Sequence, residues 1–353
     1  MLYSMPSRLL SRLLPFTLLL STLCLLAPTS SIRAEPLPLM TWNTEGAEVA
    51  PEVLAKRIEQ ALNKVGPVAV LVLQELVSEA QLQAVAKTNG FRDWAMSDFS
   101  PPVAITKAWH KSLEVAVLSR LPIESVAEWD TTGRKRNGDG HPPSRSASGV
   151  PTRELRIKVK TSDPPPPRGF LRVDLAGGWT IYAVHWKSSR GKHCSAQDQA
   201  NARLREQQAA GLAADAATAV ASGRTIIIAG DYNIQAPGRV LRVGTNPRLD
   251  CQPTKGRCEG LCGPGGLDGY DDSIAILLGI DDSARLLSGN LDSTYLLRRF
   301  PGGAIDHILV AGPEAQRFST AITPAASGQR WQGSDHRPIL IKAAEHALTP
   351  SHH

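Results

Sequence analysis

Hydrophobic and polar positions divide the chain into short apolar runs separated by longer amphipathic stretches. Apolar runs of roughly four to eight residues bounded by Gly and Pro are typical of buried strands, whereas apolar positions at helical spacing are typical of helices. Strands are predicted at residues 37–43, 68–74, 113–119, 155–160, 171–175, 179–185, 225–231, 304–310 and 337–342. Helices are predicted at residues 51–65, 78–90 and 196–221. The pattern therefore predicts a strand-rich α/β protein.

Two stretches without periodicity interrupt this pattern. Thr131–Val150 is polar, basic and turn-forming, which predicts a surface loop that is either a solvated insertion or a basic flap near a substrate. Asp163–Gly169, with the sequence DPPPPRG, is typical of a stiff connection between strands.

The N-terminal segment has the pattern of a secretory signal. Arg8 and Arg12 precede the apolar run Leu13–Ala27, and the small-residue region Pro28–Ala34 follows. The run is shorter than the about 20 residues that span a bilayer, so we expect cleavage at or shortly before Ala34 and no stable membrane insertion afterwards. The predicted organisation is a signal peptide at residues 1–34, one domain at residues 35–345 and a short tail at residues 346–353. Such a protein is exported, either to a periplasm or into the medium.

Composition and charge narrow the class of partner only slightly. With 353 residues and 42% hydrophobic content, the chain is long enough to bury a large core. The formal net charge of +6 falls to about +3 when the three arginines of the leader are removed. A mildly basic protein permits a phosphate-rich polyanion as substrate without requiring one.

Four cysteines remain after the leader is removed, and an even number in an exported protein predicts disulfides. They are Cys194, Cys251, Cys258 and Cys262, and three of them lie in the Gly- and Pro-rich segment Gln235–Asp268. Two disulfides with three alternative connectivities are the favoured interpretation. A zinc site is the competing interpretation, but the spacing is irregular and no His pair follows.

Polar residues stand at or beside the ends of several predicted strands. A single Asp after a strand is usually a turn former, and a single buried His is usually structural. A sheet nevertheless brings strand ends together from distant positions, where carboxylates and imidazoles need solvent, a metal or a polar partner. The set consists of Asn43, Glu75, His185, Asp231, Asn233, Asp306, Asp335 and His336. Together they predict one reactive site.

The motifs that contain these residues resemble those of the endonuclease/exonuclease/phosphatase superfamily, in the same order, over about residues 37 to 343. They are WNTEGA around Asn43, LQE ending at Glu75, LSRLPI at residues 118–123, VHWKS around His185, GDYN at residues 230–233, AIDHILV around Asp306 and SDHRPI at residues 334–339. The resemblance implies a four-layered α/β sandwich of the DNase I type, in which two mainly antiparallel sheets pack face to face with helices outside.

The resemblance also implies a metal site at one rim of the sandwich. Glu75 would be the main carboxylate ligand of one or two Mg²⁺ or Mn²⁺ ions, with Asn43 and Asp335 beside it. Hard oxygen ligands with an incomplete protein shell suit such ions, which keep waters or substrate oxygens as further ligands.

The same resemblance assigns roles in phosphoester hydrolysis. His336 would activate or orient the attacking water, and Asp306 would fix its ring. Asp231 would orient or activate the nucleophile, and Asn233 would donate to the phosphate. His185 would face the same phosphate or donate a proton to the leaving oxygen.

Three further residues are assigned with alternatives. Lys187 shares a strand face with His185, which suits a second phosphate contact or a solvated rim lysine. Arg153 is either a substrate contact or part of a surface salt bridge. His307 should be structural or support the site indirectly, because adjacent strand residues face opposite ways.

The leading functional prediction is a monomeric, exported, metal-dependent nuclease or related phosphodiesterase, whose partner is a phosphoester substrate such as nucleic acid. The alternative within the same chemistry is a lipid or sugar phosphoesterase, similar to sphingomyelinases or inositol-phosphate phosphatases. A catalytically silent binding protein on the same scaffold is the alternative outside the enzymes. It is disfavoured because each motif residue expected for catalysis is present.

Overall fold

The computed structural model describes residues 37–46, 49–99, 113–129, 144–158, 168–189, 196–236, 241–243, 246–248, 271–297, 300–324 and 330–342. All of them belong to one compact unit, Ala34–His353. The predicted signal peptide, the short tail, the five cysteines and most of the Thr131–Val150 loop lie outside the described residues. Within the described ranges, no helix combines the length and the apolar character needed to cross a bilayer.

Two large sheets form the framework of the described residues. The first sheet has the strand order β17-β1-β2-β4-β3-β6 and the second has the order β13-β16-β10-β9-β8-β5-β7. Most neighbouring strands are antiparallel, but β1 pairs in parallel with β2, β9 with β10 and β5 with β7. The strands of the first sheet are β1 (Leu39–Asn43), β2 (Val70–Leu76), β3 (Asp93–Ser97), β4 (Glu114–Ser119), β6 (Ser144–Ser146) and β17 (Ile339–Ile341). Those of the second are β5 (Ile123–Trp129), β7 (Thr152–Glu154), β8 (Phe170–Leu175), β9 (Trp179–His185), β10 (Thr225–Asp231), β13 (Arg285–Leu286) and β16 (Asp306–Ala311).

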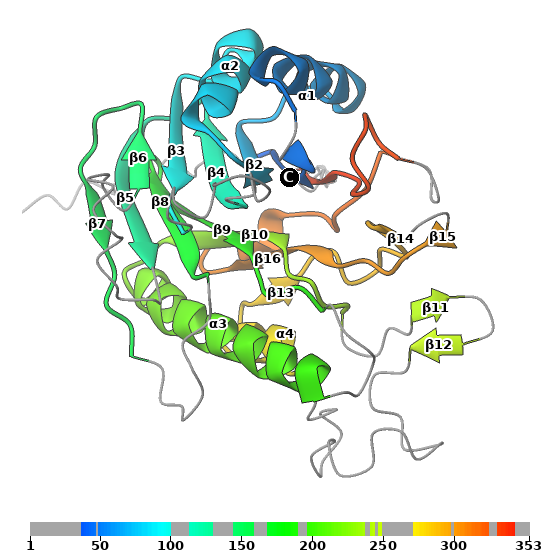
Figure 1. The fold of residues 1–353 in the computed structure, drawn as a ribbon. Coiled ribbons are helices and arrows are strands. Elements are labelled where there is room, and N and C mark those ends of the chain that lie inside the picture. The colour runs from blue at the N-terminus through cyan, green and yellow to red at the C-terminus, as the bar shows by residue number, and fades with distance from the viewer. Residues whose placement is uncertain are drawn as a thin grey trace, which may run out of the picture. The chain divides into compact units, whose positions relative to one another are not determined.

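Helices cover the outer faces of both sheets, which confirms the predicted four-layered sandwich (Figure 1). Helices α1 (Pro51–Val65) and α2 (Glu79–Asn89) pack on the first sheet, and α3 (Ala196–Ala221) and α4 (Ser273–Leu278) pack on the second. A third apolar cluster lies between the two sheets. The remaining elements are the short hairpins β11 (Leu241–Val243) to β12 (Asn246–Arg248) and β14 (Leu296–Leu297) to β15 (Phe300–Pro301), and the 3-10 turn η4 (Ala315–Arg317).

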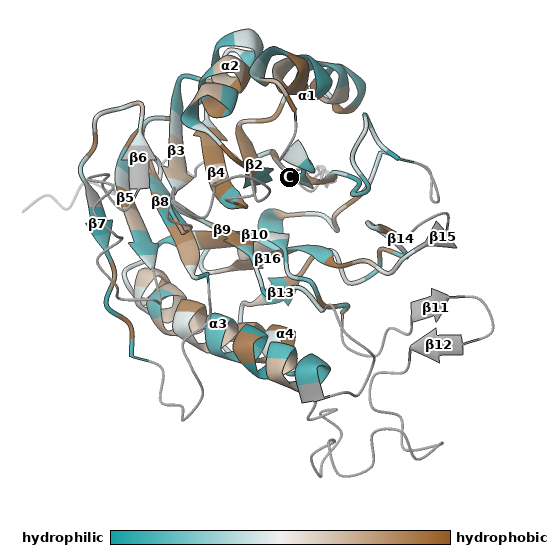
Figure 2. Cartoon of the chain, viewed as in Figure 1, coloured by the Kyte–Doolittle hydropathy of each residue, from teal (hydrophilic) through white to brown (hydrophobic). Residues whose placement is uncertain are grey.

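Burial on both faces explains why the central strands appear in the sequence as continuous apolar runs. In β10, Ile227 and Ala229 face the cluster between the sheets, whereas Ile226 and Ile228 pack under α3 and α4. Figure 2 shows the corresponding hydrophobic colouring along the central strands and mixed colouring on the helices.

Local signals account for the helix boundaries. Pro51 begins α1, where its missing N–H costs nothing. The Ser78 side chain caps α2 by accepting a hydrogen bond from the Gln81 N–H at 3.2 Å. The helix ends at Gly90, which adopts the left-handed conformation (φ +66°) that glycine tolerates best.

One predicted strand was wrong, and the missed strands include two of the longer ones, β3 and β5. The strand predicted at residues 155–160 is not regular over its described part, because edge strand β7 pairs with β5 only over three residues before it, at Thr152–Glu154. Its apolar residues Leu155 and Ile157 instead pack against the cluster beneath α3. Strands β3 and β5 were missed because polar and charged residues interrupt their apolar runs, as in IESVAEW.

Candidate active site

Strand alternation turns four of the predicted site residues toward the same inner face. Leu39 in β1, Ile181 and Ala183 in β9, and Ile227 and Ala229 in β10 belong to the cluster between the sheets, as do Ile308 and Val310 in β16. Side chains two residues apart share a face. The strand-end residues on these faces are Asn43, His185, Asp231 and Asp306. Asp231 is paired in register with both His185 and Asp306, so three of the four are adjacent.

Glu75 reaches this face through a distortion of β2. The pairing with β4 shifts between Gln74 and Leu76, and Glu75 has a φ of +63°. A left-handed conformation at a non-glycine residue costs on the order of 1–3 kcal/mol and is concentrated at functional sites. The bulge brings Glu75 Oε1 to 3.3 Å from Asn43 Nδ2 and 3.9 Å from His185 Nε2.

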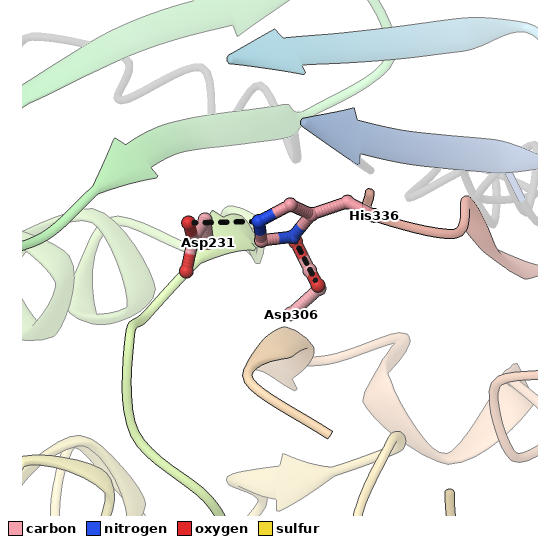
Figure 3. Close-up of side chains that lie close together, drawn as sticks. All are labelled: Asp231, Asp306 and His336. Carbon is pink, nitrogen blue, oxygen red and sulfur yellow. Dashed lines mark hydrogen bonds and ion pairs between the residues drawn. The ribbon is translucent and has the colours of Figure 1, made fainter. Parts of the chain in front are cut away.

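His336 and Asp306 form a hydrogen-bonded pair, shown with Asp231 in Figure 3. His336 Nδ1 lies 2.9 and 3.0 Å from the two carboxylate oxygens of Asp306, so this nitrogen donates. The Thr294 hydroxyl donates to Asp306 Oδ2 at 2.6 Å and so fixes the carboxylate. Nε2 of His336 is left facing Asp231 Oδ2 at 3.9 Å.

The distances from Asp231 Oδ2 to the two histidine rings are longer than a hydrogen bond and leave room for a bridging atom. Asp231 Oδ2 lies 3.6 Å from His185 Nε2 and 3.9 Å from His336 Nε2. Asn43 Nδ2 donates to the same oxygen at 3.1 Å, and the Asn233 N–H donates to Oδ1 at 2.8 Å. A polar contact longer than about 3.5 Å is commonly completed by water or a ligand oxygen.

Burial and neighbouring charges perturb the titration of the site. Burial raises the pKa of Asp231 to about 7, against the opposing effect of His336. Burial alone would lower the pKa of His336, but the carboxylates of Asp306, Asp231 and Asp335 outweigh it and raise the pKa to about 10. Burial, with the charges of Arg168 and His336, holds the pKa of His185 well below 6.5. His185 is therefore neutral and His336 is cationic when the carboxylates alone set the local field.

His185 keeps one ring nitrogen without a hydrogen bond. Its Nδ1 is buried and has no partner among the described residues. The Leu113 backbone lies near the ring and favours its charged form, but outside hydrogen-bond geometry. The ring is thus held by packing and by its backbone.

The donor set fits a divalent cation at the rim. The side chains of Glu75 and Asp335 are 22% and 28% exposed. Burial raises the pKa of Asp335. The charge of His336 opposes this shift, and the charges of Glu45 and Glu75 add to it. Such an excess of carboxylates is the environment that Mg²⁺ or Mn²⁺ binds, and a bound cation would also lower the pKa of His336 toward the range of a base.

A second group of side chains could also bind one metal ion. Ligand atoms of Asp231, Asp306 and His336 lie within 4.8 Å of one another. However, Asp306 already accepts from His336 and Thr294, so an ion there would have to displace these bonds. In the structure the amide oxygen of Asn43 accepts from the Glu45 N–H at 3.2 Å, and its role as a ligand stays a prediction.

The other predicted residues have mixed positions. Asn233 (φ +55°) donates from Nδ2 to the Trp186 carbonyl at 3.2 Å. Lys187 is half-buried immediately beyond β9. Arg153 is exposed on edge strand β7, which β8 and β5 separate from β9. Asn233 and Lys187 therefore lie near the end of β9, where His185 is, whereas Arg153 lies at the far edge of the sheet. The roles of all three residues stay predictions.

Glu45 and Arg330 lie beside Asp335 and were not among the residues predicted from sequence. Glu45 and Arg330 form an ion pair, and the Asp335 N–H donates to Glu45 Oε2 at 3.3 Å. Glu45 is also one of the few non-glycine residues with positive φ, at +48°. The WNTEGA motif could have indicated Glu45, but Arg330 has no local signal because the contact joins residues 285 positions apart.

His307 turns away from the face that carries Asp306, as alternation predicted for a structural or indirectly supporting residue, and its ring contacts Tyr232. Its Nε2–H donates to the Ile234 carbonyl at 2.8 Å, which leaves Nδ1 to accept from the Ser288 hydroxyl at 2.8 Å. Burial lowers the pKa of His307 to about 4, although Ile234 and Asp306 favour the charged form.

This lowered pKa predicts a pH-dependent stability. Unfolded His307 gains a proton below about pH 6.5 and the folded residue only near pH 4, so its contribution is present above pH 6.5 and is lost as the pH falls. Between pH 7 and 5, the free energy of unfolding should fall by about 2 kcal/mol more in the wild type than in His307→Gln. Urea unfolding in chelator at both pH values measures this difference. An equal loss in both proteins would contradict the assignment.

Comparison with known proteins identifies the family. The model of the Endonuclease/Exonuclease/phosphatase family matches residues 40–336, which include the motif residues from Asn43 to His336. The chain belongs to this family. Its members are hydrolases that act on phosphoester bonds and use divalent metal ions, and the chain is such an enzyme.

Solved structures of the family share the fold at low identity. A variant of the 3′ phosphatase NExo from Neisseria, bound to product DNA hairpin, is 18% identical, with a TM-score of 0.51 over 88% of this chain and 100% of that chain. An AP endonuclease from Archaeoglobus fulgidus is 14% identical, with a TM-score of 0.52 over 87% and 99%. A comparison with curated protein sequences gives no match.

Proposed function

We propose that the protein is an exported nuclease that hydrolyses phosphodiester bonds with a water molecule activated by His336 and Asp306. The observation that carries the proposal is the convergence of Glu75, His185, Asp231 and His336 at one rim, with separations of 3.6–3.9 Å between His185 or His336 and Asp231. Nucleic acid is favoured as the substrate class because the similar structures include a phosphatase bound to a DNA hairpin and an AP endonuclease.

Each residue of the site has a separate role in the proposed reaction. Asp306 holds His336 Nδ1–H, so Nε2 is the atom that accepts a proton from water. Asp231 faces the same space and orients the water. Neutral His185 donates a hydrogen bond from Nε2 to the phosphate, where negative charge accumulates in the transition state.

Glu75 and Asp335, with Asn43 beside them, would hold Mg²⁺ or Mn²⁺. The bound cation would supply Lewis-acid polarisation of the phosphate and stabilise the leaving oxygen. Glu45 lies next to Asp335 and completes a carboxylate-rich rim around this position. The half-buried Lys187 is a candidate contact to the same phosphate or its neighbour.

A substrate panel tests the proposed function. Plasmid, single-stranded DNA, RNA, sphingomyelin and phosphomonoesters should be incubated with Mg²⁺, Mn²⁺, Ca²⁺ or chelator. We expect cleavage of nucleic acid with Mg²⁺ or Mn²⁺, loss of cleavage in chelator, and a steep fall in rate with salt because several phosphates are contacted. Turnover of sphingomyelin or a phosphomonoester with nucleic acid left intact would reject the nuclease and favour the lipid or sugar phosphoesterase.

Export carries a separate prediction about the cysteines. We expect the protein recovered from an oxidising compartment to begin near residue 35 and to contain no free thiol, because Cys194, Cys251, Cys258 and Cys262 form two disulfides. N-terminal sequencing and thiol titration of the denatured, unreduced protein measure both. Two or more free thiols would reject the two-disulfide assignment.

A further inference from the structure

The segment that follows β9 is held by side chains. The Trp186 N–H still bonds to the Asp231 carbonyl at 2.9 Å, as in the strand ladder. Beyond it, the Trp186 carbonyl accepts from Asn233, and the Lys187 N–H donates to Gln208 Oε1 at 3.0 Å. The Lys187 carbonyl accepts from Arg205 Nη1 at 2.9 Å. Side chains from elsewhere in the fold therefore fix the backbone next to His185.

Two of these side chains come from one buried face of α3. Arg205 and Gln208 are one helical turn apart and are 3% and 1% exposed. Arg205 Nε also contacts Asp271 Oδ2 at 2.5 Å, and Asp271 Oδ1 accepts from the Ser273 N–H at 3.3 Å. The pair thus ties α3 to the start of α4 as well as to Lys187.

Gln208 is engaged on both sides of its amide. Its Oε1 accepts from the Lys187 N–H, and its Nε2 donates to the Arg168 carbonyl at 2.8 Å. Arg168 in turn donates from Nη1 to the His185 carbonyl at 3.0 Å. Gln208 therefore contacts the Lys187 N–H directly and is linked through Arg168 to the carbonyl of His185.

Burying a polar side chain at these helix positions costs free energy unless its polar atoms find hydrogen-bond partners. Apolar residues of α3 such as Ala209, Leu212 and Ala216 pack against the sheet, and Asn201 is another buried polar residue of the helix. A buried Arg or Gln loses more side-chain freedom than a short apolar residue does, and it also loses the hydration of its polar atoms. Here the contacts of Arg205 and Gln208 go to the Lys187 backbone, to the Arg168 carbonyl and to Asp271, and Arg168 in turn bonds to the His185 carbonyl.

We infer that Arg205 and Gln208 are positioning residues that act through the Lys187 backbone to hold His185 against Asp231 and Glu75. The inference rests on the proposed function for its catalytic consequence, but its structural part does not. His185 has no hydrogen bond at Nδ1 within the described residues, so its placement depends on its backbone, which the ladder with β10 holds on one side and the Lys187 segment bound by these two residues continues on the other. Small displacements of a group that contacts the reacting atoms lower rates strongly.

The test compares Gln208→Met with Tyr182→Phe. Methionine is close to glutamine in size but releases Lys187 and the Arg168 carbonyl. Tyr182→Phe is the matched control, because it removes another buried hydrogen bond between β9 and α3, from the Tyr182 hydroxyl to Asp215 Oδ2 at 2.7 Å. Both variants lose a buried side-chain hydrogen bond and should be destabilised similarly, but only Gln208→Met removes a contact to the His185–Lys187 segment.

The expected result is a fall in kcat of about 10-fold or more for Gln208→Met at saturating metal, with KM changed by less than about threefold. Tyr182→Phe should stay within about twofold of the wild type. The imidazole signals of His185, assigned by the loss of a signal in His185→Gln, should shift in NMR spectra of histidine-labelled Gln208→Met and not in Tyr182→Phe.

Two results would overturn the inference. One is a folded Gln208→Met protein with unchanged His185 signals and a kcat within twofold of the wild type. The other is an equal effect of both variants, which would indicate a general stability effect. If the wild type shows no phosphoesterase activity, the proposed function fails, and the NMR comparison alone decides the positioning role. If Gln208→Met does not fold, Arg205→Lys replaces it, because lysine keeps a charge for Asp271 while losing the forked contact to Lys187.

Discussion

Replacing Glu75 with glutamine is expected to lower turnover by about 100-fold or more while the protein stays folded. Residues that only support a metal ligand typically cost about 10- to 100-fold in affinity or activity, and a direct ligand should cost no less. Glutamine keeps the size of the side chain and can occupy the bulge of β2, but it has no charge for a divalent cation. The exposed Glu52→Gln in the first turn of α1 is the matched control and should behave as the wild type.

Two measurements separate metal binding from catalysis in this variant. Calorimetric titration with Mn²⁺ should show weakened binding in Glu75→Gln and unchanged binding in Glu52→Gln. Higher Mg²⁺ should restore part of the lost activity, since the remaining carboxylates still attract the ion. Wild-type turnover of a correctly folded Glu75→Gln protein at limiting Mg²⁺ would show that Glu75 is not the main ligand.

Removing His336 is expected to lower the rate of the chemical step by about 10²- to 10⁴-fold, the usual contribution of a general base. His336→Ala should also flatten the acidic limb of the pH–rate profile, because that limb reports protonation of the base at low pH. The neighbouring histidine supplies the control: His307→Gln should keep most activity, since His307 bonds to Ser288 and the Ile234 carbonyl. An unchanged acidic limb in His336→Ala would assign the base to another group.

The strand-end residues could be predicted from sequence because alternation and burial are local signals. Asp231 ends an apolar run in which every second residue faces the other sheet, and His185 and Asp306 end their strands in the same way. The sequence does not by itself state that these strands are neighbours. The order of the motifs supplied that step, and the register confirms it.

Other features depend on contacts that no local pattern contains. Simple alternation places Gln74 on the inner face and turns Glu75 toward α1 and α2, and only the bulge re-aims Glu75. The Arg330–Glu45 ion pair and the contacts of Gln208 join segments far apart in the chain. The amphipathic pattern of α3 predicts a helix, but it does not show that two polar residues on its buried face support the site.

The most direct test of the account is single-turnover cleavage of DNA by His336→Ala, Asp306→Asn and the double variant, with metal saturation checked for each. Asp306 accepts from His336 Nδ1 at 2.9 Å and has no other assigned role in the reaction, so the two residues should act as a unit. We predict that the double variant is only slightly slower than the slower single variant. Rate losses that multiply, or a near-normal rate for His336→Ala, would contradict activation of water by this pair.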